Sequence, residues 1–189
     1  MAVVLPADPR ATLEETPQGL QVIIPAKRNL LTTLFLGFWL CGWAMGEIMV
    51  PVAFFRGDVD PGAMLFVIAW LAIWTIGGGV AFYVFFWQIA GHERVLLTPS
   101  SLSIKREVFG VGRTREYLLT HLRNLRVSPP NFNPFDFRAG LQFWGIGGGP
   151  ITFDHGAATI RFGAGLEESE ARSVVEQLRS RASFGESAA

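Results

Sequence analysis

Histidine is the side chain best suited to acid–base chemistry near neutral pH, and this 189-residue sequence contains three. His92, His121 and His155 stand in separate stretches, and no GxSxG nucleophile motif accompanies them. The sequence also lacks the HxxxH, HExxH and CxxC spacings that bring metal ligands together. It therefore predicts a protein that is not an enzyme, with no catalytic residue, no metal site and no cofactor.

A glycine-rich stretch from Gly145 to Pro150 resembles the loops that hold phosphate groups. Such a loop must open a helix, because the phosphate binds to the N-terminal amides of that helix. Here Pro150 and a strand-like segment from Ile151 to Phe153 follow, and the Gly-Lys-Ser/Thr signature is missing. We interpret the stretch as a hairpin loop.

An aromatic segment from Ser128 to Arg138 has the composition of a binding surface. Phe132, Phe135 and Phe137 alternate there with polar residues among three prolines. The prolines exclude a regular helix or a central strand, and exposed aromatic rings are typical anchors of protein interfaces. We interpret the three rings as partner-binding residues. Contact with the membrane surface and packing inside the fold are the alternatives.

Basic residues outnumber acidic ones by eight to three between Arg94 and Arg138. We interpret Arg94, Lys105 and Arg106 as contacts to anionic lipid headgroups, worth about 1 kcal/mol each near such a surface. The alternative is that they lie on ordinary solvated strand faces. No nucleic-acid reading motif accompanies the charge, so we expect no nucleic-acid partner.

Two long apolar runs must position these residues. From Leu30 to Phe55 the single charged residue is Glu47, and from Gly62 to Gly91 there is no Lys, Arg, Asp or Glu. Each run exceeds the roughly 20 residues that a helix needs to cross a bilayer. The sequence predicts a transmembrane hairpin over residues 30–90, with helices at 30–55 and 62–90. We interpret Glu47 as reaching water near the turn, with a proton relay as the alternative.

The basic residues near the two runs predict the orientation of the hairpin, because they collect on the cytoplasmic side. The turn, residues 56–61, carries one arginine and two aspartates. Five basic residues lie on the side of the termini: Lys27, Arg28, Arg94, Lys105 and Arg106. We therefore expect a multi-pass protein of the bacterial inner (cytoplasmic) membrane with both termini in the cytoplasm.

The remaining segments read as about seven short strands followed by one helix. Apolar residues recur with helical spacing from Glu167 to Ala182, which predicts an amphipathic helix. The strands are expected at 19–25, 94–98, 102–108, 114–119, 122–127, 151–153 and 159–162, with a further candidate strand at 141–144 and a turn at 110–112. This pattern predicts an α+β protein whose small antiparallel sheet or partly open barrel has a helix packed over its end.

Two apolar helices followed by the strand-turn-strand Glu93–Glu107, a later strand Leu122–Val127 and a terminal helix resemble the bacterial membrane-anchored pleckstrin-homology-like (PH-like) proteins. The general layout is also similar to the photosystem I assembly factor of chloroplasts and cyanobacteria. The resemblance implies a PH-like fold and carries no catalytic signature. The aromatic insertion Asn131–Arg138 departs from it.

The predicted organisation is a cytoplasmic N-terminal strand segment (1–29), the transmembrane hairpin (30–90), a cytoplasmic β-rich PH-like domain (91–182) and a flexible tail (183–189). The hypothesis that follows is a membrane-anchored binding or scaffolding protein, an accessory subunit or assembly factor of a membrane protein complex. A module that senses lipid headgroups in the bilayer is the alternative.

Overall fold

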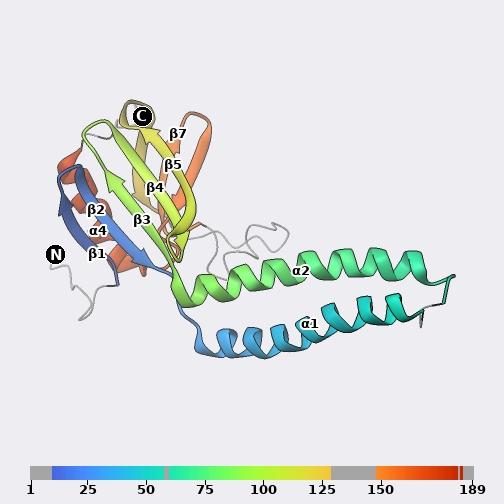
Figure 1. Cartoon of the computed structure of the whole chain (residues 1–189). Helices are drawn as coiled ribbons and strands as arrows, with labels where there is room; N and C mark the ends of the chain where they lie inside the picture. The colour runs from blue at the N-terminus through green and yellow to red at the C-terminus, as the bar shows by residue number, and fades with distance from the viewer. Residues whose placement is uncertain (1–9, 58–59, 129–147, 183, 185–189) are drawn as a thin grey trace. The chain divides into compact units, whose positions relative to one another are not determined.

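The computed structural model describes residues 10–57, 60–128, 148–182 and 184. The chain divides into two compact units (Figure 1). One is helical and comprises Arg28–Ile89. The other combines Met1–Lys27 with Ala90–Ala189 and contains all the described β-strands. The helical unit is thus an insertion between two parts of the β-rich unit.

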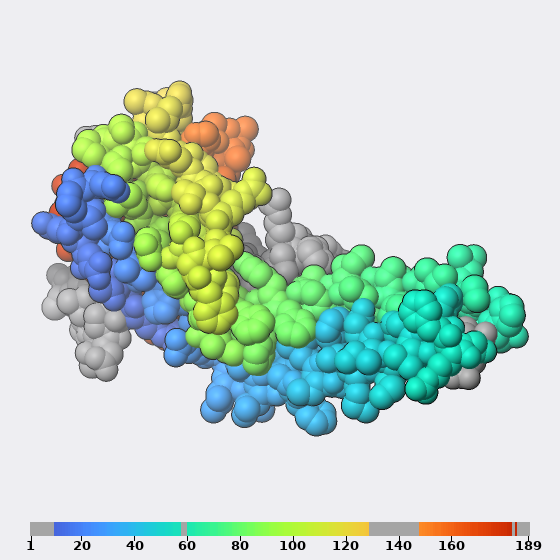
Figure 2. Space-filling view, viewed as in Figure 1, coloured from blue at the N-terminus to red at the C-terminus, as the bar shows by residue number. Residues whose placement is uncertain are grey.

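Two long helices form a hairpin: α1 covers Leu30–Arg56 and α2 covers Met64–Ala90. Each contains 27 residues, is predominantly apolar and leaves most of its surface exposed. Figure 2 shows their side chains in contact along the hairpin. Both helices are long and apolar enough to cross a membrane, and their bounds confirm the two predicted helices to within two residues.

Trp43 of α1 packs into the second helix at Gly78. Its indole Nε1 donates a hydrogen bond of 3.0 Å to the backbone carbonyl of Trp74. A Cβ atom at Gly78 would lie 1.9 Å from the Trp43 ring, so a larger residue at this position would push the two helices apart. Gly78 therefore sets the close approach of the hairpin.

Glu47 faces α2. Its Oε1 accepts a hydrogen bond of 2.6 Å from the Thr75 hydroxyl, and its Oε2 is enclosed with no hydrogen-bond partner among the described residues. Glu47 is nine residues from the end of α1, or about 14 Å along the helix axis. The contact with Thr75 was not part of the sequence interpretation, in which the carboxylate reaches water near the turn.

The described residues of the β-rich unit form two antiparallel sheets and one α-helix. The first sheet has the strand order β1-β2-β3-β4-β5, and the second has the order β6-β7-β8. The first comprises β1 (Thr12–Thr16), β2 (Gly19–Pro25), β3 (Gly91–Leu97), β4 (Ser101–Val108) and β5 (Val111–Leu118). A short 3-10 turn, η1 (Leu119–His121), leads to β6 (Leu122–Val127), β7 (Ile151–His155), β8 (Ala158–Phe162) and the helix α4 (Glu168–Arg181).

Most of the predicted elements are confirmed. The strand at 19–25, the two strands that pair around Asp154-His-Gly156, and the C-terminal amphipathic helix all have bounds close to those predicted. The predicted turn at 110–112 is wrong, because Phe109 and Gly110 alone form the turn and β5 begins at Val111. The strand β1 was not predicted, and the one predicted at 141–144 lies outside the described residues.

The N-terminal strand β2 lies between β1 and β3, although residues 26–90 separate it from β3 in sequence. Pro25, the last residue of β2, is the register partner of His92 in β3. Helix α1 begins five residues after Pro25, and β3 begins at Gly91, directly after α2. Both chain connections to the helices therefore leave the same end of the five-stranded sheet.

The core of the β-rich unit is apolar and draws on both sheets and on α4. Val22, Ile24, Val95 and Leu102 come from the first sheet, Leu122, Leu125, Ile151, Phe153 and Phe162 from the second, and Ala171, Val174 and Leu178 from α4. Alternation along β2 and β3 turns every second side chain inward. The stripe of α4 predicted to be buried is the one that packs on this core.

A buried carboxylate links the first sheet to the segment that directly follows β8 of the second sheet. Glu93 of β3 is 1% exposed, and its Oε1 forms an ion pair of 2.5 Å with Arg106 Nε on β4. Its Oε2 accepts backbone hydrogen bonds from Gly163 at 2.5 Å and from Ala164 at 3.3 Å, just after β8. Glu93 thus satisfies both of its oxygens by linking β3, β4 and the start of the β8–α4 connection.

Replacing Glu93 by glutamine should open this end of the fold, because Arg106 would lose its counter-charge in a largely buried site. Breaking one partner of a buried pair costs about 3 kcal/mol or more, equivalent to about a hundredfold faster exchange of protected amides. Hydrogen–deuterium exchange mass spectrometry of full-length Glu93→Gln, read on peptides from β3 and β8, measures this. Glu15→Gln, which breaks the exposed pair of Glu15 with Arg181, is the matched control. Equal effects of the two changes would contradict the assigned role of Glu93.

Candidate functional site

The three residues predicted to contact lipid headgroups lie on adjacent strands but on two faces of the sheet. Arg94 of β3 and Lys105 of β4 are register partners, and both form ion pairs with Glu107. Arg106 lies on the other face, where it pairs with Glu93. The structure therefore brings Arg94 and Lys105 together and separates Arg106 from them.

Glu107 is the centre of an ionic cluster on the outer face of the first sheet. It is 2% exposed, and its Oε1 lies 2.6 Å from His92 Nε2 and 2.8 Å from Arg94 Nη2, while Lys105 pairs with its Oε2. The hydrogen bond from Lys105 lowers the pKa of Glu107 below its ordinary value, against the opposing effect of burial. Two permanent cations surround one carboxylate, so the cluster has a net positive charge. The side chains of Arg94 and Lys105 remain 41% and 32% exposed and accessible to an anion.

His121 and His155, which belong to separate stretches of sequence, meet in the fold. Their ring centroids are 6.1 Å apart in an edge-to-face arrangement, and the Tyr117 ring lies 5.3 Å from that of His155. Among the described residues, no group of three or more His, Cys, Asp or Glu side chains is placed to hold a metal ion. The contact of these two histidines is one of aromatic packing beside the core.

The predicted partner-binding residues Phe132, Phe135 and Phe137 lie outside the described residues. They belong to the connection between β6 and β7, which the structure describes up to Ser128 and again from Gly148.

A surface groove lies between β6 and α4. Its volume is about 390 Å³, and arginines stand around two valines in its lining. The lining residues are Arg126 and Val127 of β6 and Arg172, Val175, Glu176 and Arg179 of α4. On α4 these four residues have the spacing i, i+3, i+4, i+7, so they form one stripe of the helix.

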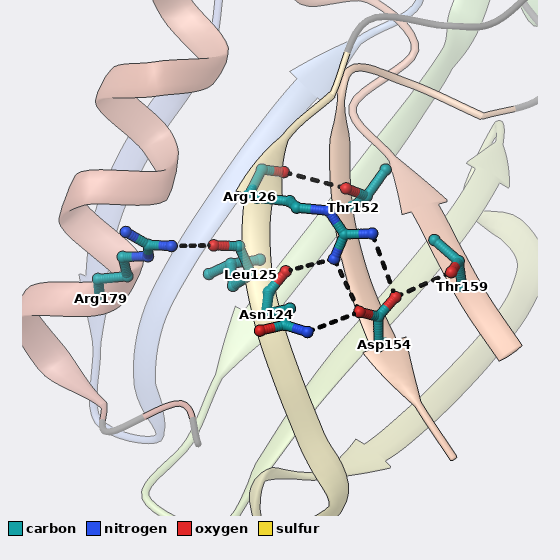
Figure 3. Close-up of polar contacts among 7 residues, drawn as sticks. All are labelled: Asn124, Leu125, Arg126, Thr152, Asp154, Thr159 and Arg179. Atoms are coloured by element: carbon teal, nitrogen blue, oxygen red, sulfur yellow. Dashed lines mark hydrogen bonds and ion pairs between the residues drawn. The ribbon is translucent and has the colours of Figure 1, made fainter. Parts of the chain in front are cut away.

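Arg126 is held by Asp154 at one side of this groove (Figure 3). Its Nη1 donates to Asp154 Oδ2 at 2.8 Å and its Nη2 to Oδ1 at 3.4 Å. Asn124 Nδ2 and the Thr159 hydroxyl donate to the same carboxylate at 3.0 and 2.8 Å. These hydrogen bonds, that of Arg126 first, lower the pKa of Asp154 to about 2. The charge of Arg126 is therefore balanced within the fold.

The local backbone geometry of β6 allows these hydrogen bonds to Asp154. Asn124 has a φ of 52°, a left-handed conformation that asparagine tolerates better than most residues. The pairing of β6 with β7 shifts register between Arg123 and Arg126, as expected at a β-bulge. The bulge leaves Asn124 and Arg126 both within hydrogen-bond distance of Asp154, which pairs with Arg123 in the register.

The two arginines of α4 that line the groove are bound differently. Arg179 Nη2 donates a hydrogen bond of 2.5 Å to the backbone carbonyl of Leu125, which fastens α4 to β6 (Figure 3). Arg172 forms an i, i+4 pair with Glu168 in which both side chains are exposed. No carboxylate in the described part of the chain lies within ion-pair distance of Arg179. Of the two α4 arginines in the groove, Arg179 thus has a structural role and Arg172 is exposed to solvent.

The groove was not predicted from the sequence. Its residues come from segments that are about 45 positions apart, and the helical pattern at 167–182 indicates only the buried stripe. The groove stripe Arg172-Val175-Glu176-Arg179 shares Val175 with that buried stripe and adds polar residues beside it. It is indistinguishable from an ordinary solvated face until the strand opposite it is known.

No known protein family matches this chain, and comparisons with curated proteins and with solved structures gave no match.

Asp154 should make the stability of the β-rich unit dependent on acid pH. Its pKa is lowered in the fold from 3.8 to about 2, so the stabilisation is complete above pH 4 and disappears as the pH falls to about 2. Asp154→Asn should therefore cost about 1–2 kcal/mol at pH 7 and almost nothing at pH 2. Urea unfolding of the full chain in non-ionic detergent, followed by far-ultraviolet circular dichroism, measures the difference. Glu168→Gln is the control and should change stability by less than about 0.5 kcal/mol; a cost of Asp154→Asn that is the same at both pH values would contradict the assignment.

Proposed function

We propose that this protein is a membrane-anchored binding and scaffolding protein, an accessory subunit or assembly factor of a membrane protein complex. In this proposal α1 and α2 cross the inner (cytoplasmic) membrane, and the β-rich unit works in the cytoplasm without catalysing a reaction. The two antiparallel sheets followed by one C-terminal helix support a PH-like architecture for that unit.

The observation that carries the proposal is the double connection of neighbouring strands to two apolar helices. β2 leads into α1 through residues 26–29, and α2 continues into β3 without a linker. A β-rich unit that is joined to two apolar helices by two covalent connections suits a protein that acts at a membrane.

Two candidate binding segments are neighbours in sequence at the end of β6. The groove beside α4 includes Val127, and the chain leads from Ser128 into the segment that carries Phe132, Phe135 and Phe137. Burial of one phenylalanine is worth roughly 1.5–3 kcal/mol, so three rings are sufficient to anchor a modest interface. We take the partner to be another membrane protein, because both proteins would then be held in the same bilayer.

A second candidate function, a module that senses lipid headgroups, is favoured by the cluster around Glu107. Arg94 and Lys105 give it a net positive charge, and its residue His92 follows the last residue of α2 by two positions. Each cation near an anionic surface contributes about 1 kcal/mol, which is a weak but additive attraction.

The proposed orientation predicts the side from which single cysteines react. In a Cys41→Ser background, Asp58→Cys should be labelled in intact cells by a reagent that cannot cross the inner membrane, because residues 56–61 face outward. Ser101→Cys should be labelled only after the cells are opened. Labelling measured by mass shift on a gel distinguishes the sides, and the reverse pattern would overturn the cytoplasmic assignment.

Extraction of the protein in gentle detergent should yield an assembly larger than one chain by native mass spectrometry. Replacing Phe132, Phe135 and Phe137 together by serine should release the chain, because the aromatic anchors are lost, while it stays membrane-inserted. Amide exchange of the β-rich unit is the control: unchanged protection separates loss of docking from loss of folding. A lone wild-type chain that binds more tightly to anionic liposomes than to zwitterionic ones would favour the second candidate.

A further inference from the structure

We propose that the groove between β6 and α4 binds an extended acidic segment of a partner protein. In this proposal the segment pairs with the free edge of β6 as a further strand and places a carboxylate beside Arg179. The inference rests on the proposed scaffolding function and names the chemistry of one of its contacts.

The strand β6 is at an edge of its sheet. The described strands of that sheet have the order β6-β7-β8, so one edge of β6 is paired with β7 and the other edge is paired with no described strand. An unpaired edge presents a row of N–H and C=O groups to which an extended peptide can hydrogen-bond. Strand addition of this kind is a recurring mode of peptide recognition.

Two hydrogen bonds show which backbone groups of β6 face the groove. The N–H of Ser128 donates to the carbonyl of Pro150, 2.7 Å away and directly before β7. Successive residues of a strand direct their N–H and C=O groups to opposite edges, so those of Val127 point away from β7. The carbonyl of Leu125, two residues earlier, also faces this edge, where it accepts the hydrogen bond from Arg179 of α4 (Figure 3). The backbone of Val127 therefore faces the side of β6 on which α4 and the groove lie.

A polypeptide matches this edge better than a small anion does. The N–H of Val127 requires an acceptor and its C=O requires a donor, and an extended backbone supplies both. The side chains of Val127 and Val175 form the apolar part of the groove, which is suited to an apolar side chain of the added segment. The groove volume of about 390 Å³ is within the range of ligand pockets, roughly 300–1,000 Å³.

The charge of the groove selects an acidic segment. Three arginines and one glutamate line it. Asp154 balances the charge of Arg126, and an exposed pair with Glu168 balances that of Arg172. Arg179 instead donates to a neutral carbonyl through Nη2, and its side chain is exposed. A guanidinium group has five N–H donors, so Arg179 retains donors for a carboxylate of the ligand.

A fluorescent peptide tests the preference for an acidic segment. The probe has eight residues in which valine alternates with glutamate, with both ends blocked, and its control has glutamine in place of each glutamate. Fluorescence anisotropy with the full chain in non-ionic detergent should show saturable binding of the glutamate peptide. The glutamine peptide should bind about tenfold more weakly, because a charge-assisted hydrogen bond is lost.

Arg179→Gln should remove the difference in affinity between the two peptides, and Arg172→Gln should preserve it. A structural role of Arg179 alone would affect both peptides equally. Absence of binding of the glutamate peptide, or equal affinity of the wild-type chain for both peptides, would overturn the proposal.

Val127→Pro tests strand addition. Proline removes the N–H that faces the groove and leaves the hydrogen bonds between β6 and β7 in place, because that N–H points away from β7. Val127→Ala, which also shortens the side chain but keeps the N–H, is the matched control. We expect at least about tenfold weaker binding of the glutamate peptide to the proline variant than to the alanine variant, with equal amide-exchange protection in β7. Equal affinities would contradict strand addition, and the comparison on Arg179 does not depend on this variant.

Native mass spectrometry of the same variants distinguishes a second copy of this chain as the occupant. A wild-type dimer that becomes a monomer with Val127→Pro would assign the edge to a second copy and overturn the proposal. A wild-type chain that binds the glutamate peptide but is isolated alone would retain this inference and contradict the scaffolding function. A stable assembly with a partner in which the wild-type chain does not bind the peptide would do the reverse.

Discussion

The structure depends on the pairing of β2 with β3 across residues 26–90. Closing so long a connection is tolerable because the entropic cost of loop closure grows only with the logarithm of length. The connection is also ordered, because α1 and α2 run antiparallel and return the chain to the sheet. The side chain of Gln88 near the end of α2 accepts hydrogen bonds from Asn29 and Thr33 at the beginning of α1. The helices therefore return the chain so that β2 and β3 can pair. The register of the sheet then determines which residues lie at its junction with the helices.

That junction is where the charged residues of the first sheet are concentrated. Glu93 and Glu107 are both nearly inaccessible and belong to register pairs next to one another, but they face opposite sides of the sheet. Glu93 faces inward, where Arg106 and two backbone amides satisfy it; Glu107 faces outward under Arg94 and Lys105. A buried carboxylate is tolerated only with such partners. The result is an inner link between the sheets and an outer surface with a positive charge.

The parts of this fold that could be predicted are those with local patterns. The apolar runs predicted both helices to within two residues, and a short apolar segment bounded by Pro17 and Pro25 predicted β2. The sequence Thr-Leu-Glu-Glu-Thr in β1 has a single apolar residue and no pattern to recognise. Arg94, Lys105 and Arg106 were selected as one basic group, but only the register shows that Arg106 turns to Glu93. The groove between β6 and α4 joins distant segments in the same way. Register and packing partners are non-local, so no window of sequence contains them.

The start of β5 was missed for a different reason. The glycines at 110 and 112 suggested a turn, but Gly112 lies in the strand, where a Cβ would collide with the backbone carbonyl of Arg106. The real turn places phenylalanine at a position that favours asparagine or glycine. The pattern of glycines therefore placed the turn too late in the chain, because the turn is set by the pairing of β4 with β5 and not by the glycines alone.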